Sequence, residues 1–287
     1  MQNIIEQFKN AMLDNFINPP ETVIGDGQLH RFKIEGKLNG AYVLHTDGRA
    51  AGYFEDFKQG IKIRWKLAGD FKPLTDAEKK AFAIERQRQS EQRKIEEKTR
   101  HDNATQKAAH IWNKATPAIN HPYLIKKAVQ PYTTRIYKGA LVVPLYAENS
   151  ELVSLQFIAD DGSKRMMKGG KAQGSCCYIG NVTKITHDSI ILICEGWATG
   201  ASLYETTGYV TVVAFSSGNL TAVAGHIRKQ YPDNEIIVCG DNDESGVGQQ
   251  AAINAALAIN GSYVVPPDIG DFNDYSLSLQ VVSDDSE

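Results

Sequence analysis

Three acidic residues in the last third of the chain have types and spacing that suit the binding of a divalent metal ion. Glu195 follows the apolar run IILIC, and Asp241 and Asp243 follow the apolar run EIIVC. Because Asp241 and Asp243 are one residue apart, both side chains point the same way in extended geometry. Carboxylate oxygens are the ligands that Mg²⁺ and Mn²⁺ prefer, and these ions bridge readily to phosphate oxygens. The three carboxylates therefore predict a metal-dependent centre for phosphodiester chemistry.

A further acidic pair, Asp271 and Asp274 in the segment GDFNDY, follows the last predicted strand and could complete a second metal position. Any one of these acidic residues could instead cap the start of a helix, since Asp and Glu are favourable there. For Asp243 or Asp274 taken alone, both interpretations stay open. Three acidic loops after three strands of one sheet favour the metal site.

Spacing excludes two other metal sites and one nucleotide-binding loop. The segment DNDESG (241–246) imitates a calcium-binding loop, but the twelfth position of that loop, which requires Glu, is Ala252. The sequence has no CxxC pair and its histidines lack the spacing of metal ligands, which excludes a zinc ribbon. Gly169 and Gly174 have the spacing of a phosphate-binding loop, but Ser175 stands where that loop needs lysine.

The carboxylates are expected at one edge of a parallel sheet. From Ser189 onward the sequence alternates strand patterns (IILIC, VTVVAF, EIIVC, SYVV) with helix patterns (ATGASLYETT, LTAVAGHIRKQY, GQQAAINAALAI). Continuous apolar strands between amphipathic helices predict a parallel sheet covered on both faces. In such sheets ligands bind beyond the carboxyl ends of the strands, which is where the acidic residues stand.

Three further parts are predicted before this α/β domain, which covers residues 188–287. Residues 1–72 form a small β-rich domain, since RFKIEG, GAYVLHT, AAGYFED and GIKIRWKL are short runs separated by Gly and Asp turns. Residues 73–116 form a charged, solvated helical connector that begins at a capping box, TDAE (75–78). Residues 117–187 form an α+β subdomain with a basic rim.

Charge is divided unevenly along the chain. From Lys58 to Lys171 there are 23 Lys and Arg against 12 Asp and Glu, whereas from Asp188 to Glu287 there are 2 against 14. A basic surface beside an acidic pocket is what an enzyme needs to hold phosphates and metal ions together. The basic residues expected to bind the phosphates of a nucleotide or nucleic acid are Lys126, Lys127, Lys164, Arg165, Lys168 and Lys171. A solvated hairpin rim is the alternative role for them.

Aromatic side chains are candidates for stacking on unpaired bases, although core packing is the favoured role for most of them. They are Trp112, Tyr123, Tyr132 and Tyr137, together with Tyr42, Tyr53, Phe54 and Trp65 nearer the amino terminus.

The composition is that of an ordinary soluble protein, expected in the cytoplasm. The 287 residues are 42% hydrophobic, which is enough for about two domains. No stretch approaches the ~20 apolar residues of a membrane helix, and the first residues do not resemble a secretion signal. The four cysteines, Cys176, Cys177, Cys194 and Cys239, suit reduced buried thiols better than a disulfide framework.

The order of CEG at Glu195, GDND at 240–243 and GDFND at 270–274 resembles the Toprim domain shared by bacterial-type primases, topoisomerases and some nucleases. The preceding segments HPYLIKK, VVPLY and SLQFIADDGSKRMMKGGK resemble the primases of plasmids, phages and integrated mobile elements. The segments LHRFKIEG and NGAYVLHTDGRAAGYFED are similar to the amino-terminal region of the same proteins. In those primases a basic groove leads to the Toprim acids and binds template and nucleotides. The chain departs from cellular bacterial primases in lacking their zinc ribbon.

The resemblance implies a DNA primase, a nucleotidyltransferase that makes short primers on a single-stranded DNA template from nucleoside triphosphates. Two Mg²⁺ or Mn²⁺ ions would activate the primer 3′-hydroxyl and stabilise the leaving pyrophosphate. Their expected ligands are Glu195, Asp241 and Asp243, with Asp271 and Asp274 nearby. Strand opening would need a separate replicative helicase. Two alternatives stay open: a Toprim-type metal-dependent nuclease with Glu195 as general acid or base, and a non-catalytic single-stranded DNA-binding replication factor.

Overall fold

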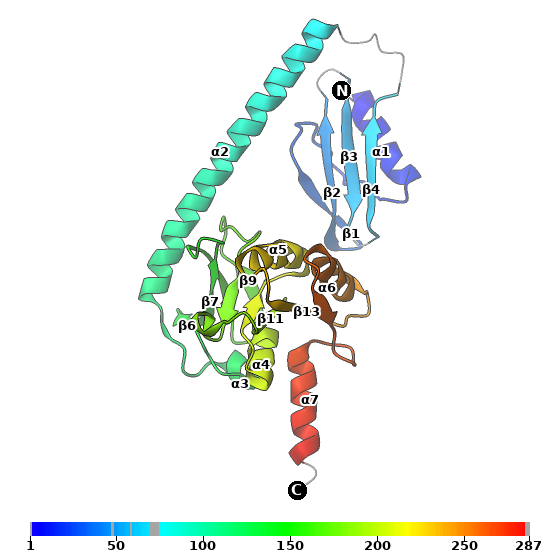
Figure 1. Cartoon of the computed structure of the whole chain (residues 1–287). Coiled ribbons are helices and arrows are strands. Elements are labelled where there is room, and N and C mark those ends of the chain that lie inside the picture. The colour runs from blue at the N-terminus through cyan, green and yellow to red at the C-terminus, as the bar shows by residue number, and fades with distance from the viewer. Residues whose placement is uncertain (1, 47–48, 58, 69–74, 285–287) are drawn as a thin grey trace. The chain divides into compact units, whose positions relative to one another are not determined.

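The computed structural model describes residues 2–46, 49–57, 59–68 and 75–284. The chain divides into two compact units, Met1–Arg86 and Gln87–Glu287. Figure 1 traces both units, and the division between them falls inside the long helix α2 (Asp76–Lys114). Within the described part of the chain, every helix is too short or too polar to cross a membrane.

The first unit is a helix packed on one face of a four-stranded antiparallel sheet. Its elements are α1 (Gln2–Asp14), β1 (His30–Ile34), β2 (Lys37–His45), β3 (Ala51–Asp56) and β4 (Ile61–Lys66), with strand order β1-β2-β3-β4. Phe8 and Met12 of α1 are fully buried against Tyr42 and Phe54 of the sheet. The β-rich prediction is confirmed. The helix α1 is an addition to it, and the apolar residues of α1 recur at helical spacing along one side.

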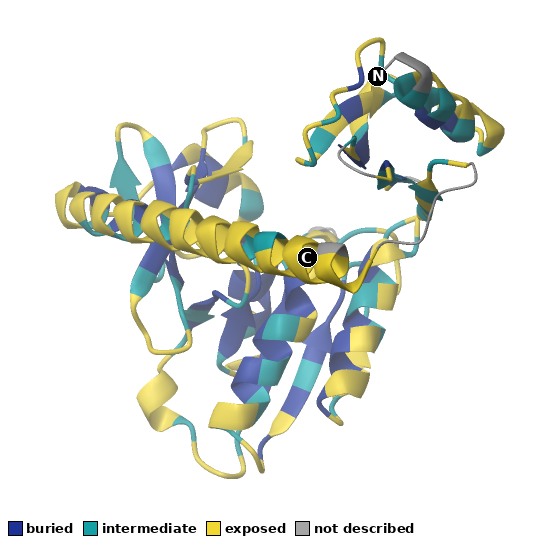
Figure 2. Cartoon of the chain, turned by 90° about the horizontal axis from the view of Figure 1, so that it is seen from above, coloured by how far each residue is buried: buried dark blue, intermediate teal, exposed yellow. Residues whose placement is uncertain are grey.

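The long helix α2 is exposed along most of its length, as Figure 2 shows, and is packed at its carboxyl end. Ala104, Ala108 and Ile111 are buried in a cluster with Val142 and Leu155 of the following sheet. The helix begins directly after Thr75 and ends before Thr116–Pro117, as the sequence predicts. The side chain of Glu78, the other half of the predicted capping box, lies outside the described residues.

The second unit begins with a five-stranded antiparallel sheet. In order across the sheet, the strands are β5 (Thr116–Pro117), β6 (Arg135–Tyr137), β7 (Ala140–Tyr146), β8 (Leu152–Ile158) and β9 (Lys164–Met166). A short helix, α3 (Pro122–Lys127), lies between β5 and β6 in the chain. Strands β7 and β8 are buried on both faces, because α2 covers one face and the core of the last domain covers the other.

The carboxyl-terminal sheet has the order β10-β12-β11-β13-β14. Its strands are β10 (Cys177–Ile179), β11 (Ile190–Cys194), β12 (Thr211–Val213), β13 (Glu235–Cys239) and β14 (Ser262–Val264). All but the antiparallel edge strand β10 run parallel, which confirms the predicted parallel sheet. The helices are α4 (Trp197–Thr207), α5 (Leu220–Gln230), α6 (Val247–Ala258) and α7 (Phe272–Asp284), with 3-10 turns η1 (Val182–Lys184) and η2 (Ser217–Asn219).

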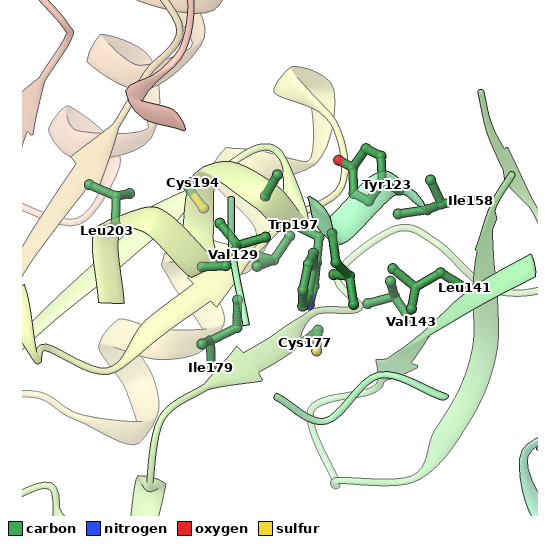
Figure 3. Close-up of a cluster of buried hydrophobic side chains, with 14 of the residues drawn as sticks. Tyr123, Val129, Leu141, Val143, Ile158, Cys177, Ile179, Cys194, Trp197 and Leu203 are labelled. Atoms are coloured by element: carbon green, nitrogen blue, oxygen red, sulfur yellow. The ribbon is translucent and has the colours of Figure 1, made fainter. Parts of the chain in front are cut away.

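Helices cover both faces of this parallel sheet. Ile191 and Ile193 of β11 are buried with residues of α5 and α6, whereas Leu192 and Cys194 are buried with residues of α4. The cluster on the α4 side continues into the middle sheet, and Figure 3 shows Trp197 of α4 beside residues of both sheets. Residues 117–187 and 188–287 therefore share one hydrophobic core.

The four cysteines are free and buried, as predicted. Burial raises the pKa of the Cys177 and Cys239 thiols to about 12. At neutral pH these thiols are protonated and behave as small apolar side chains.

Candidate active site

The acidic residues after β11 and β13 lie at the same edge of the parallel sheet. The two strands are hydrogen-bonded neighbours, and their backbone register places Cys194 opposite Cys239 at their carboxyl ends. Glu195 and Gly240 therefore leave the sheet at the same level, and Asp241 follows Gly240. The register of one strand pair brings together residues that are 46 positions apart in the sequence.

A short antiparallel bridge brings the third acidic loop to the same edge. The N–H of Asn242 donates to the carbonyl of Gly270 at 2.9 Å, and the N–H of Gly270 donates back at 2.9 Å. Asp271 follows this bridge, and its negative charge contributes to raising the pKa of Glu195 and of Asp241. Three predicted ligands from three loops, Glu195, Asp241 and Asp271, thus lie close enough to repel one another.

Asp241 has a strongly perturbed carboxyl group. Burial raises the pKa of Asp241 to about 7, and the charges of Glu195 and Asp271 add to the rise, whereas Lys164 opposes it. Its Oδ1 atom is buried and has no hydrogen-bond partner among the described residues. A buried carboxylate oxygen without a donor is costly unless a cation binds it. The side chain of Asp241 therefore fits the role of a metal ligand.

Glu195 shares this environment to a lesser degree. Burial raises the pKa of Glu195, the charge of Lys164 lowers it, and the charge of Asp243 raises it again. The backbone of Glu195 is held in place, because the N–H of Phe215 donates to its carbonyl at 2.8 Å. A carboxyl group with a raised pKa exchanges a proton closer to neutral pH, which suits acid and base chemistry.

Asp243 is held by the start of helix α6. Its Oδ2 accepts the N–H of Gly248 at 2.6 Å, and its Oδ1 accepts the N–H of Val247 at 3.2 Å and the hydroxyl of Ser245. The hydroxyl of Ser245 and these backbone donors lower the pKa of Asp243. In the structure, the carboxylate of Asp243 therefore caps the start of α6. Its role as a metal ligand stays a prediction.

Asp271 and Asp274 together cap the start of α7. Asp271 Oδ1 accepts the N–H groups of Asn273 at 2.8 Å and Asp274 at 3.0 Å, and Asp274 Oδ2 accepts the N–H of Asp271 at 3.3 Å. Lys127 of α3 donates to Asp274 Oδ1 at 3.0 Å. Burial opposes ionisation of Asp274, but the bond to Lys127 and its charge hold the pKa of this carboxyl below its usual value.

No three His, Cys, Asp or Glu side chains converge into a ready-made metal cage in the described parts of the chain. The hydrogen bonds supply a reason, since the carboxylates of Asp243 and Asp274 are engaged by helix starts. The residues that fit a cation best are Asp241, with its unpartnered oxygen, and Glu195, the strongest of the charges that act on it.

Lys164 of β9 is the predicted basic residue that reaches the acidic cluster. Its Nζ lies 3.9 Å from the point where a Cβ on Gly196 would stand, and its charge lowers the pKa of Asp241. The guanidinium of Arg165 lies 4.9 Å from the centre of the Phe157 ring. Because successive strand residues point to opposite faces, Lys164 faces the acids and Arg165 faces away.

The other predicted basic residues are distributed over different surfaces. Lys168 lines a cavity together with Arg100 of α2, and Lys171 lines a second cavity together with Lys94 of α2. Lys126 is exposed on α3. The structure therefore places Lys127 and Lys164 near the acids and Lys168 and Lys171 beside α2, with Lys126 in neither group.

Asn219, which the sequence patterns do not single out, anchors the glycine-rich basic loop. Its buried Nδ2 donates to the carbonyls of Ala172 at 3.1 Å, Ser175 at 3.0 Å and Ala214 at 2.8 Å. Its Oδ1 accepts the N–H of Gly174 at 2.7 Å. These bonds join the loop after β9 to the end of β12. The sequence feature that could have identified Asn219 is its place as a polar residue shortly after the apolar run VTVVAF.

Residues 190–279 match the family model described as the Toprim domain. This region is a Toprim domain. The match runs from β11 into α7 and contains every acidic residue predicted to bind metal. The resemblance based on CEG, GDND and GDFND is therefore confirmed.

Most of the chain outside the Toprim domain also has similar relatives. A DNA primase TraC of Escherichia coli is 31% identical in an alignment of 266 positions, which covers 86% of this chain and 24% of the relative. A second TraC of the same organism is 31% identical in an alignment of 278 positions, which covers 92% of this chain and 19% of that relative. The chain thus spans about a quarter or less of these relatives.

Among solved structures, the primase fragment of the bacteriophage T7 primase-helicase protein is similar to this chain. The likeness covers 57% of this chain and 74% of that one, with a TM-score of 0.43 and 15% identity.

Proposed function

We propose that this chain is a DNA primase, a nucleotidyltransferase that joins nucleoside triphosphates into short primers on a single-stranded DNA template. The observation that carries the proposal is the buried, unpartnered carboxylate oxygen of Asp241 beside Glu195 and Asp271. The Toprim domain and the similarity to TraC support the same activity.

Mg²⁺ or Mn²⁺ would be held first by Asp241 and Glu195. The further predicted ligands of a two-ion centre are Asp243, Asp271 and Asp274. When bound, the ions would stabilise negative charge on phosphate oxygens and activate the attacking hydroxyl. Lys164 would add a positive charge beside the acids, where the phosphates of an incoming nucleotide must sit.

The two groups of basic residues would divide the work of binding. Lys164 adjoins the acids and would contact the nucleotide, while Lys168 and Lys171 lie beside α2 and would hold the template backbone. Lys126, Lys127 and Arg165 are the remaining predicted contacts. Strand opening would come from a separate replicative helicase.

A primer-synthesis assay tests the proposal. The protein is incubated with unlabelled single-stranded DNA, Mg²⁺ or Mn²⁺ and labelled nucleoside triphosphates, and short labelled products are expected. Asp241→Asn and Glu195→Gln are each expected to abolish synthesis while the circular dichroism spectrum stays unchanged. Full activity in both variants would contradict the proposal.

Two parallel reactions identify the alternative functions. End-labelled DNA that is cut in the presence of metal, without labelled nucleotide products, would assign the chain to the nucleases. Metal-independent DNA binding with neither reaction would make it a non-catalytic binding factor.

The substitutions Lys164→Gln and Arg165→Gln form a matched pair at neighbouring positions. Primer synthesis should fall at least tenfold more in Lys164→Gln than in Arg165→Gln, because only Lys164 of the two faces the acids.

A further inference from the structure

The sheet of the first unit has two faces of opposite character. One face is covered by α1 and forms a hydrophobic core that includes Phe32, Tyr42, Phe54 and Trp65 around Phe8. Alternation along each strand sends the intervening side chains to the other face. The core role favoured for Tyr42, Phe54 and Trp65 is therefore the one observed, and these rings are on the wrong face to meet a ligand on the open one.

Cross-strand pairs identify the residues of the open face. Arg31 of β1 is opposite Ala41 of β2, which is opposite Glu55 of β3, which is opposite Lys62 of β4. The next row pairs Tyr53 of β3 with Arg64 of β4, and the row after it pairs Ala51 with Lys66. We call this surface the outer face; its basic and aromatic members are Arg31, Lys33, Tyr53, Phe57, Lys62, Arg64 and Lys66.

Aromatic rings and cations alternate on the outer face. The Nζ of Lys62 lies 4.3 Å from the centre of the Tyr53 ring, and the guanidinium of Arg31 lies 4.4 Å from the centre of the Phe57 ring. Phe57 is 51% exposed, although a large apolar ring would normally be buried. Tyr53 and Phe57 are four residues apart along the chain, a separation of about 13 Å in extended geometry.

The charge of the outer face is strongly positive. Glu55 is the acidic side chain on this face of the four strands, and it is paired with Lys62 at 2.9 Å. Among the described residues, the side chains of Lys33, Arg64 and Lys66 show no ion pair or hydrogen bond, and all three are exposed. Cations left in water on one face of a sheet create a field that attracts polyanions.

We propose that the outer face binds single-stranded nucleic acid. Arg31, Lys62, Arg64 and Lys66 would contact the phosphates, and Tyr53 and Phe57 would stack on two bases of one strand. Such a combination of a cationic track with separated rings is how proteins bind unpaired strands without reading sequence, since every base offers a flat face. An acidic peptide would match the charges but would leave the half-buried ring of Tyr53 and the exposed ring of Phe57 without a planar partner.

This proposal goes beyond the primase activity and does not depend on it. It rests on side chains of the first unit alone, whereas the proposed catalysis rests on the carboxylates of the Toprim domain. Binding to the outer face needs no metal ion. Measurements in EDTA therefore test the outer face without testing the catalytic centre.

The charge arm of the experiment measures binding of a fluorescent oligothymidylate to the 287-residue chain in EDTA, over a range of salt concentrations. Arg64→Ala combined with Lys66→Ala is expected to weaken binding about tenfold. The double variant should also lower the slope of log affinity against log salt by about 1.4, since each phosphate contact on a single strand contributes about 0.7. The matched control is Lys80→Ala combined with Arg86→Ala, which removes the same two residue types from the exposed surface of α2 and should change the affinity less than twofold.

The aromatic arm tests stacking separately from charge. Tyr53→Leu and Phe57→Leu keep an apolar side chain and remove the ring, and each is expected to weaken binding about five- to a hundredfold without changing the salt slope. Circular dichroism and the melting temperature establish that the variants are folded. Photocrosslinking to oligonucleotides with 5-iododeoxyuridine should attach the strand to Tyr53 or Phe57.

The proposal is overturned if the Arg64 and Lys66 double variant binds as tightly as its control, or if every crosslink maps to residues 87–287. Capture of an acidic protein by the outer face together with wild-type DNA affinity of these variants would equally overturn it. Loss of primer synthesis in Asp241→Asn leaves this test unaffected, so failure of either proposal is recognised independently of the other.

Discussion

The ammonium group of Lys127 in α3 lies 3.0 Å from a carboxylate oxygen of Asp274 in α7, across 147 positions of sequence. The sequence assigns Lys127 to nucleotide binding and Asp274 to metal binding, yet the fold pairs them with each other. Asn273 reinforces the link, because its amide donates to the carbonyl of Lys127 at 2.7 Å. The contact between α3 and α7 holds the loop with Asp271 beside the acidic cluster.

A double-mutant cycle of Lys127→Met and Asp274→Asn separates the structural role of this pair from a catalytic one. The side chains are 22% and 54% exposed, so solvent screens the pair and a coupling of about 0.3–1 kcal/mol in unfolding free energy is expected. Primer synthesis by Asp274→Asn should fall less than tenfold if its main role is to cap α7 and pair with Lys127. A loss as complete as that of Asp241→Asn would instead make Asp274 a metal ligand.

The raised pKa of Asp241 predicts a pH-dependent cost to the fold. Its pKa is about 7 in the folded protein and 3.8 in the unfolded reference, so the folded state binds more protons between these values. Stability from this group therefore falls as the pH rises from 4 to 7. In EDTA at pH 8, Asp241→Asn should be more stable than the wild type by about 1–3 kcal/mol, a difference that disappears near pH 4.

Urea unfolding at several pH values measures this difference, and Asp243→Asn serves as a control of opposite sign. The pKa of Asp243 is lowered in the folded state, so its carboxylate stabilises the fold above its unfolded pKa and loses that contribution as the pH falls. Asp243→Asn should therefore be less stable than the wild type at neutral pH. Equal stability of wild type and Asp241→Asn at pH 8 would contradict the buried, charged environment assigned to Asp241.

Gly248 at the start of α6 has no room for a side chain. A Cβ there would stand 2.6 Å from the backbone oxygen of Asp241 and 2.8 Å from a carboxylate oxygen of Asp243. Gly248→Ala should therefore displace the acidic loop, lower the unfolding free energy by about 1–3 kcal/mol and reduce primer synthesis at least tenfold. The control is Gly225→Ala in α5, where a Cβ would meet no atom within 4 Å. This substitution should stabilise the helix by about 0.5–1 kcal/mol. Similar effects of the two substitutions on activity would argue against the close packing of the loop.

Local patterns were sufficient to predict the elements that carry the acids. The runs IILIC and EIIVC are apolar on both sides, and they became the adjacent central strands of the parallel sheet with Glu195 and Asp241 just beyond their ends. Strand geometry is also sufficient to predict that the neighbouring side chains of Lys164 and Arg165 point to opposite faces. Which of the two faces the acids depends on how β9 packs against the rest of the unit. The packed end of α2 could not be predicted, because its few buried residues, such as Ala104 and Ala108, look like those of any solvated helix.

The sequence by itself determined the chemical types of the site, their order along the chain and their places after strands, because hydrophobic periodicity and residue type are local properties. The tertiary structure decided which of the acids are buried together and which are used elsewhere. The backbone pairing of β11 with β13, in which Cys194 is opposite Cys239, and the β-bridge between Asn242 and Gly270 bring Glu195, Asp241 and Asp271 to one edge of the sheet. Desolvation and mutual repulsion exist only after such distant segments meet, so the raised pKa of Asp241 is a property of the fold.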